Sequence, residues 1–116
     1  MAGLARFKDL CLDARDHQAL ADWWCRFLGY VRRDDERDPA WPVPIVDATG
    51  LGPLIWIVPV PEPKTVKNRM HVDVSGRTDE LLAAGATLVL ARGEDRGWDV
   101  LADPEGNEFC VFEPEG

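Results

Sequence analysis

The two halves of this chain show the same order of secondary-structure patterns, and this repetition limits the possible folds more than any single motif. Residues 7–13 alternate with a period of two, which predicts a strand. Between Asp16 and Gly29, apolar residues recur three and four positions apart, which predicts an amphipathic helix with Asp16 as its N-cap and Gly29 as its stop. Further strands are predicted near residues 30–33, 43–48 and 53–60.

The second half repeats this plan after an extended linker, which we expect at Pro59, Pro61 and Pro63 because proline is excluded from central strands. Residues 69–75 alternate again, and residues 79–84 predict a short helix that ends at Gly85. The remaining predicted strands are 86–90, 98–102 and 108–112. The sequence therefore predicts one domain, residues 1–116, built from two βαβββ modules at about residues 4–60 and 67–114.

Composition excludes several classes of function. The net charge is −8 and no basic footprint is visible, so nucleic acid is not an expected partner. No apolar run approaches the roughly 20 residues of a membrane span, and the N-terminal residues lack the apolar core of a signal peptide. Three cysteines without a CxxC pair predict free thiols and a cytoplasmic location. The acidic run 34–38 is expected to be a solvated loop rather than a cation site.

A turn in the last quarter of the chain, residues 103–107, leads into the final strand. Pro104 sets the first corner, Gly106 supplies a positive φ, and Asn107 tolerates the left-handed region. In the strand that follows, Glu108, Cys110 and Phe112 alternate with Phe109 and Val111. One face therefore suits a core, and the group at Cys110 decides whether the other face can hold a metal.

Three segments, in this order and spacing, resemble the vicinal oxygen chelate superfamily, and more narrowly its small glyoxalase-like domains from actinobacteria. They are the helix exit Ala21-x-x-Trp24-x-x-Phe27-Leu28-Gly29-Tyr30, the segment Lys67-Asn68-Arg69-Met70-His71-Val72-Asp73-Val74, and the turn Asp103-Pro104-Glu105-Gly106-Asn107. The resemblance covers about residues 4–114. It implies an α+β fold in which two βαβββ modules form a cupped mixed sheet, and it implies a homodimer.

The resemblance also implies where a metal would bind. Metal-using members line the cup with four ligands, two from each module, and three of these positions match Asp9, His71 and Cys110, the last of which is Glu in those members. The fourth falls on the apolar strand 54–58, which supplies no ligand. Mg²⁺ and Mn²⁺ require several oxygen ligands, so we expect no metal cofactor, with His71 as a hydrogen-bonding group and Cys110 as a small apolar filler. A zinc site of Asp9, His71 and Cys110 is the alternative.

Without a metal, the cup is expected to bind a small molecule. If apolar residues such as Met70, Val72 and Val74 face the helices, the opposite faces present Asp9, Cys11, Asp13, His71, Asp73, Glu108, Cys110 and Phe112. Trp56 adds an aromatic wall, and Trp41, in a proline-rich loop, is a candidate for contact with a ligand or a partner chain. Arg69 either positions an anionic group of the ligand or balances nearby carboxylates.

Three functions remain open at this point. The first is a metal-independent small-molecule-binding domain, resembling family members that act in sequestration or resistance. The second is a lyase or isomerase that uses His71 with Asp9 or Asp73 as base and acid. The third is a dimeric interaction module. No GxSxG, P-loop or GxGxxG motif indicates other chemistry.

Overall fold

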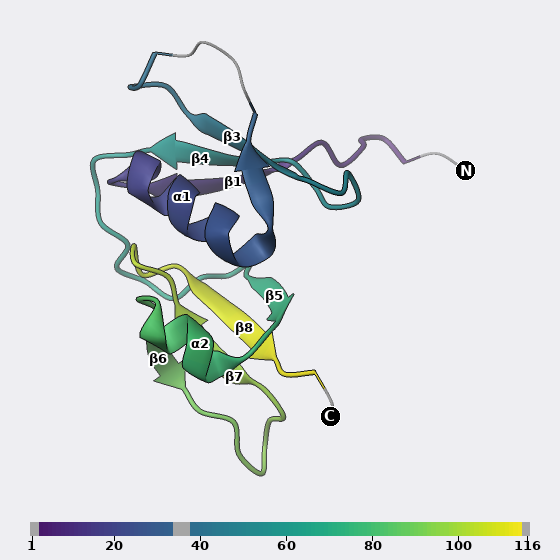
Figure 1. The fold of residues 1–116 in the computed structure, drawn as a ribbon, viewed down its shortest axis with the longest axis vertical. Coiled ribbons are helices and arrows are strands. Elements are labelled where there is room, and N and C mark those ends of the chain that lie inside the picture. The colour runs from purple at the N-terminus through teal and green to yellow at the C-terminus, as the bar shows by residue number, and fades with distance from the viewer. Residues whose placement is uncertain (1–2, 34–37, 115–116) are drawn as a thin grey trace. The chain divides into compact units, whose positions relative to one another are not determined.

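The structure is a computed structural model that describes residues 3–33 and 38–114. It divides into two compact units, residues 1–62 and 63–116 (Figure 1). Within the described residues, each unit has the order strand, helix, strand, strand, strand, which confirms the predicted βαβββ pattern. The predicted acidic loop, apart from Asp38, lies outside the described residues.

The first unit is a four-stranded mixed sheet with one helix on it. Its elements are β1 (Leu10–Ala14), α1 (His17–Leu28), β2 (Tyr30–Arg32), β3 (Val43–Asp47) and β4 (Ile55–Pro59). The strand order is β1-β4-β3-β2, with β1 parallel to β4 and the other pairs antiparallel. α1 contacts all four strands. Its predicted ends are confirmed, since the Asp16 carboxylate accepts a hydrogen bond from the Ala19 amide (3.1 Å) and Gly29 has a φ of 70°.

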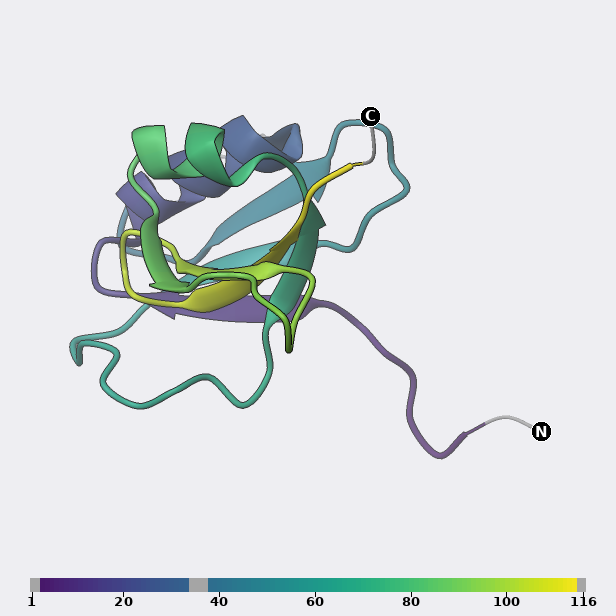
Figure 2. The same cartoon turned by 90° about the horizontal axis from the view of Figure 1, so that it is seen from below.

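The second unit repeats this topology. Its elements are β5 (Val72–Ser75), α2 (Thr78–Ala83), β6 (Thr87–Leu90), β7 (Asp99–Ala102) and β8 (Glu108–Phe112), and the strand order is β5-β8-β7-β6. β5 is parallel to β8, as β1 is to β4. Figure 2 shows the short helix α2 lying along one face of its sheet.

Three strand predictions need correction. β1 begins at Leu10 rather than at residue 7, because pairing with the segment before β4 starts only there, with a hydrogen bond from the Leu10 amide to the Leu54 carbonyl. β5 begins at Val72, so Met70 does not face the helix and is instead 81% exposed. Pro59 belongs to the central strand β4, which tolerates it because it is the last residue of that strand.

The turn at residues 103–107 is held by one buried carboxylate. Asp103 is 2% exposed, and its side chain accepts hydrogen bonds from the amides of Glu105 and Asn107, both at 2.9 Å. Gly106 has the expected positive φ, 90°, whereas Asn107 does not adopt the left-handed region. The Asn107 side-chain amide instead donates to Asp103 (3.3 Å), so this residue is suited to the turn by hydrogen bonding rather than by backbone freedom.

The two faces of β8 have different environments. Phe109 and Val111 are fully buried, at 1% and 0% exposure, and alternate with Glu108, Cys110 and Phe112 along the strand. In the parallel register they lie opposite Val72 and Val74 of β5. This apolar face forms the core of the second unit, and the other face is left for polar groups.

A buried carboxylate on β7 joins four segments of the second unit. Asp99 is 5% exposed and accepts hydrogen bonds from the Thr78 hydroxyl (2.5 Å), the Arg92 amide (2.7 Å) and the Arg92 guanidinium (2.8 Å). Arg92 also pairs with Glu113 (2.7 Å) just after β8. The Arg92 guanidinium lowers the pKa of Asp99 to about 2. The start of α2, the loop before β7 and the end of β8 therefore share one charged hydrogen-bond network.

Candidate functional site

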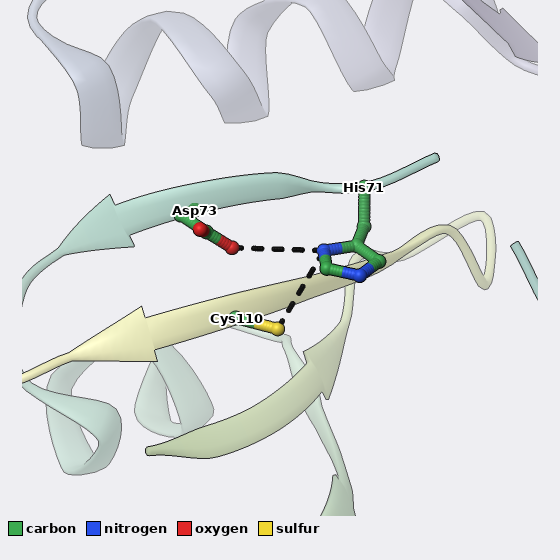
Figure 3. A group of neighbouring side chains, drawn as sticks. All are labelled: His71, Asp73 and Cys110. Carbon is green, nitrogen blue, oxygen red and sulfur yellow. Dashed lines mark hydrogen bonds and ion pairs between the residues drawn. The ribbon is translucent and has the colours of Figure 1, made fainter. Parts of the chain in front are cut away.

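Three side chains with metal-binding or acid–base chemistry converge on the second sheet (Figure 3). His71 lies immediately before β5, Asp73 lies in β5, and Cys110 lies opposite Asp73 in the neighbouring strand β8. His71 Nδ1 is 3.7 Å from Cys110 Sγ and 3.6 Å from Asp73 Oδ1. The three possible ligand atoms all lie within 4.8 Å of one another. The parallel pairing of β5 with β8 is what brings them together.

The members of this cluster differ in exposure. The side chains of His71 and Asp73 are 41% and 59% exposed, whereas Cys110 is only 5% exposed. Burial raises the pKa of Cys110, and the negative charge of Asp73 raises it further. The thiol is therefore neutral at physiological pH unless a cation replaces its proton, and the imidazole and carboxylate are the groups that a dissolved molecule reaches first.

The geometry does not match a Cys–His–Asp nucleophile. Such a relay uses one imidazole nitrogen for the thiol and the other for the carboxylate. Here both Cys110 and Asp73 face the same nitrogen, Nδ1 of His71 (Figure 3). The arrangement instead suits a single proton or cation that is shared by His71 Nδ1, Asp73 Oδ1 and Cys110 Sγ.

An aromatic pair continues the same face of β8. The rings of Trp98 and Phe112 lie 5.3 Å apart between centroids and are tilted by 31°. Phe112 is 38% exposed and follows Cys110 by two residues, so both side chains project to the same side of the strand. No local pattern in the sequence indicated that Trp98 would stack on a candidate site residue.

Glu108, a predicted ligand-binding residue, is already engaged within the second unit. Its side chain is 11% exposed, pairs with Lys64 Nζ at 2.7 Å and accepts a hydrogen bond from the Asn68 amide at 2.9 Å. Lys64 also donates to the Val66 carbonyl. The ammonium group of Lys64 lowers the pKa of Glu108, so this carboxylate is held ionised. These contacts fasten the segment before β5 to the start of β8, and a role of Glu108 in ligand binding stays a prediction.

The first unit has its own polar cluster on the strand pair β1 and β4. Asp9 accepts hydrogen bonds from Lys8 (2.8 Å) and from the Trp56 indole (2.9 Å), and the Lys8 ammonium lowers the pKa of Asp9. The Arg33 guanidinium lies over the Trp56 ring, 5.1 Å from its centroid. Cys11 lies opposite Trp56 in the ladder. The sequence reasoning did not identify Arg33 as part of this cluster.

The remaining predicted site residues are exposed. Cys11, Asp13, Trp41 and Arg69 all have exposed side chains, with Trp41 at 54%. The Trp41 amide donates to the Asp38 carbonyl, which fixes a turn in its loop. Roles of these residues in contact with a ligand or a partner chain stay predictions. Cys11, Cys25 and Cys110 are all free thiols, as expected.

The residues at the metal-binding positions that the resemblance implies do not suit hard metal ions such as Mg²⁺ and Mn²⁺. The side chains of β4 are apolar or aromatic, Lys8 and Trp56 both donate to Oδ2 of Asp9, and the donor at Cys110, where the resemblance implies a glutamate, is sulfur. Mg²⁺ and Mn²⁺ prefer oxygen ligands in octahedral geometry. The residues present therefore do not fit an oxygen-ligated metal centre.

Comparison with known proteins establishes the class of this chain. Its fold is shared with a glyoxalase/bleomycin resistance protein/dioxygenase family enzyme from Burkholderia phytofirmans PsJN, with a TM-score of 0.69 and 22% identity over 94% of this chain and 98% of that one. A model of the glyoxalase-like domain matches residues 9–112. The chain therefore belongs to the glyoxalase-like domain family, as its motifs predicted.

Other solved structures share the fold at lower identity. A glyoxalase-related enzyme from Fulvimarina pelagi matches with a TM-score of 0.66 and 17% identity, over 96% of this chain and 89% of that one. A mutant of the fosfomycin resistance protein FosX from Listeria monocytogenes, in a complex with Mn(II) and 1S,2S-dihydroxypropylphosphonic acid, matches with a TM-score of 0.70 and 12% identity, over 95% of this chain and 90% of that one. No curated protein matches the sequence. Among the described residues, no helix is long and apolar enough to cross a membrane.

Proposed function

We propose that this glyoxalase-like domain binds a small organic molecule on the face of the second sheet that carries His71, Asp73 and Cys110. The observation that supports this most is the meeting of a half-exposed imidazole and carboxylate, His71 and Asp73, over a buried thiol. The Trp98–Phe112 pair adds a flat apolar surface on the same face of β8. Apolar surface with a few convergent polar groups is the usual form of a ligand site.

The chemistry of these groups favours a ligand with both an apolar part and hydrogen-bond donors. Asp73 offers an accepting carboxylate, and His71 either donates or accepts. Lys64 and Asn68 both donate to Oε1 of Glu108, which ties this residue to the fold. The proposed binding requires neither Mg²⁺ nor Mn²⁺.

The test compares the two histidines of the chain. Tryptophan fluorescence is titrated with fosfomycin, chosen because FosX is described as a fosfomycin resistance protein, and with a panel of small aldehydes and phosphonates. Any compound that quenches the fluorescence is taken as a ligand. His71→Ala should lower the affinity for that compound by about tenfold, which corresponds to the loss of about 1.4 kcal/mol of hydrogen bonding.

His17→Ala is the matched control. His17 lies at the start of α1 in the first unit, where its Nε2 contacts the Pro39 carbonyl at 3.0 Å. This variant should bind with the affinity of the unmodified protein. Equal affinities for both variants would remove His71 from the site.

A lyase or isomerase activity at the same residues is the second candidate. Asp73 faces Nδ1 of His71, an arrangement that orients the imidazole and leaves Nε2 to exchange a proton with a bound substrate. Turnover of a bound compound that is lost in both His71→Ala and Asp73→Asn would support an enzyme. Binding without turnover supports a sequestering protein.

We also infer a cytoplasmic homodimer, as the family resemblance implies. Its support in this structure is β6, an edge strand on which Leu88, Val89 and Leu90 are 45%, 49% and 50% exposed. Replacing Leu88 and Leu90 with lysine should shift the mass measured by analytical ultracentrifugation from dimer to monomer. A monomeric unmodified protein would refute this inference.

A further inference from the structure

The cluster on the second sheet brings together a nitrogen, an oxygen and a sulfur donor, a combination that Mg²⁺ and Mn²⁺ do not favour. Zn²⁺, by contrast, accepts all three, as histidine nitrogen, carboxylate oxygen and thiolate sulfur, in tetrahedral geometry. The chemistry of His71, Asp73 and Cys110 thus favours Zn²⁺ over Mg²⁺ and Mn²⁺.

The distances in the cluster are close to those of a tetrahedral zinc site. With Zn–S of about 2.3 Å and Zn–N or Zn–O of about 2.0 Å, neighbouring ligand atoms in a tetrahedron are about 3.3–3.6 Å apart. His71 Nδ1 is 3.7 Å from Cys110 Sγ and 3.6 Å from Asp73 Oδ1. The third pair, Cys110 and Asp73, is within 4.8 Å, and the exposed side chain of Asp73 can close the remaining gap by rotation.

We propose that His71, Asp73 and Cys110 form a three-ligand zinc site that lies entirely within the second unit. Binding replaces the proton of the Cys110 thiol with the metal and releases that proton to solvent, so the bound sulfur is a thiolate. A tetrahedral ion with three protein ligands keeps one open position. The exposure of His71 and Asp73 would let solvent or a ligand reach it.

This site differs from the arrangement that the resemblance implies and revises the sequence interpretation. There, each module supplies two ligands, and the zinc alternative combined His71 and Cys110 with Asp9. Here Asp9 is held by Lys8 and Trp56 in the first unit, and Asp73 takes its place as the oxygen donor. The replacement of Asp9 by Asp73 as the oxygen ligand depends on the parallel register, which sets Asp73 opposite Cys110.

The experiment uses the full chain without an affinity tag and without any organic ligand. Calorimetric titration with Zn²⁺ should show a single ion bound per chain, and Co²⁺ should produce the near-ultraviolet absorption of a thiolate–cobalt bond. Cys110→Ser should abolish that absorption and weaken zinc binding by more than about tenfold, because even changes outside the ligand shell cost about 10–100-fold in affinity.

Two matched pairs separate this site from adventitious binding. Cys11→Ser, which removes an exposed thiol of β1, should keep the cobalt absorption. Asp73→Asn should weaken zinc binding, whereas Asp13→Asn, at another exposed aspartate, should not; this pair also serves if Cys110→Ser fails to fold. Absence of zinc binding by the folded unmodified protein, or equal binding by both members of a pair, would overturn the proposal. The inference does not depend on the proposed function, whose test measures an organic ligand without zinc.

Discussion

Replacement of Asp99 with alanine should lower the free energy of unfolding by about 2–3 kcal/mol, because it removes a buried carboxylate that accepts several hydrogen bonds, while Arg92 is half-exposed and keeps Glu113. The substitution leaves the Arg92 amide and the Thr78 hydroxyl without their acceptor and deprives the Arg92 guanidinium of one of its two carboxylates. Because α2 begins without a side-chain cap at Arg77, the bond from Thr78 to Asp99 is also part of what fixes its first turn.

The pH dependence gives this prediction a second readout. The pKa of Asp99 is lowered from 3.8 to about 2 in the folded protein. Above about pH 5 the carboxylate is ionised in both states and its contribution is complete. As pH falls from about 5 to about 2, the unfolded chain takes up the proton first, and about 2 kcal/mol of stability is lost. The stability difference between the unmodified protein and Asp99→Ala should shrink by that amount over this range.

Urea denaturation, followed by circular dichroism at pH 7, 4 and 2, measures both effects. Asp95→Ala is the control, because Asp95 is an exposed aspartate in the loop just before β7, and it should change stability by less than about 0.5 kcal/mol. A loss of less than about 1 kcal/mol in Asp99→Ala at pH 7 would show that the network contributes little.

Replacement of Phe109 with alanine should destabilise the protein by about 3–5 kcal/mol. Phe109 is 1% exposed, and it lies opposite Val72 in the parallel ladder and opposite Leu101 in the antiparallel one. The six-residue helix α2 makes a small cover for this sheet, so few other side chains of that size fill the same core. Urea denaturation at pH 7 checks the value.

Phe7→Ala removes the same side chain from an exposed position. Phe7 is 72% exposed, so this variant should keep the stability of the unmodified protein within about 0.5 kcal/mol. If Phe109→Ala were no more destabilising than Phe7→Ala, the assignment of Phe109 to the core would be wrong.

The substitutions of Asp99 and Phe109 should also affect the candidate site. Phe109 and Cys110 are consecutive in β8 and project to opposite faces, so the packing of one sets the position of the other. Asp99 lies opposite Val111 in the ladder between β7 and β8. Loss of either residue should therefore weaken zinc binding along with the fold, whereas Asp73→Asn, at an exposed position, should weaken zinc binding with little change in stability.

Much of the fold follows from local patterns. The spacing of apolar residues predicted α1, and the segment 79–84 with Gly85 after it predicted α2. Asp16 and Gly29 predicted the ends of α1, because a cap depends on bonds within one turn of the chain. The alternation in residues 108–112 predicted which side chains of β8 would be buried together. Strand starts were less predictable, since β1 and β5 begin where a neighbouring strand begins to pair with them.

The sequence by itself determined the two βαβββ modules, the ends of α1 and the two chemical faces of β8, because these depend on residues close together in the chain. The tertiary structure decided which groups bind the carboxylates. Lys64, 44 residues before Glu108, donates a hydrogen bond to Glu108, and Trp56, 47 residues after Asp9, donates one to Asp9. It also decided that Asp73 joins His71 and Cys110. Which strand lies beside which, and in what register, depends on burial summed over the whole sheet, and no local pattern carries that information.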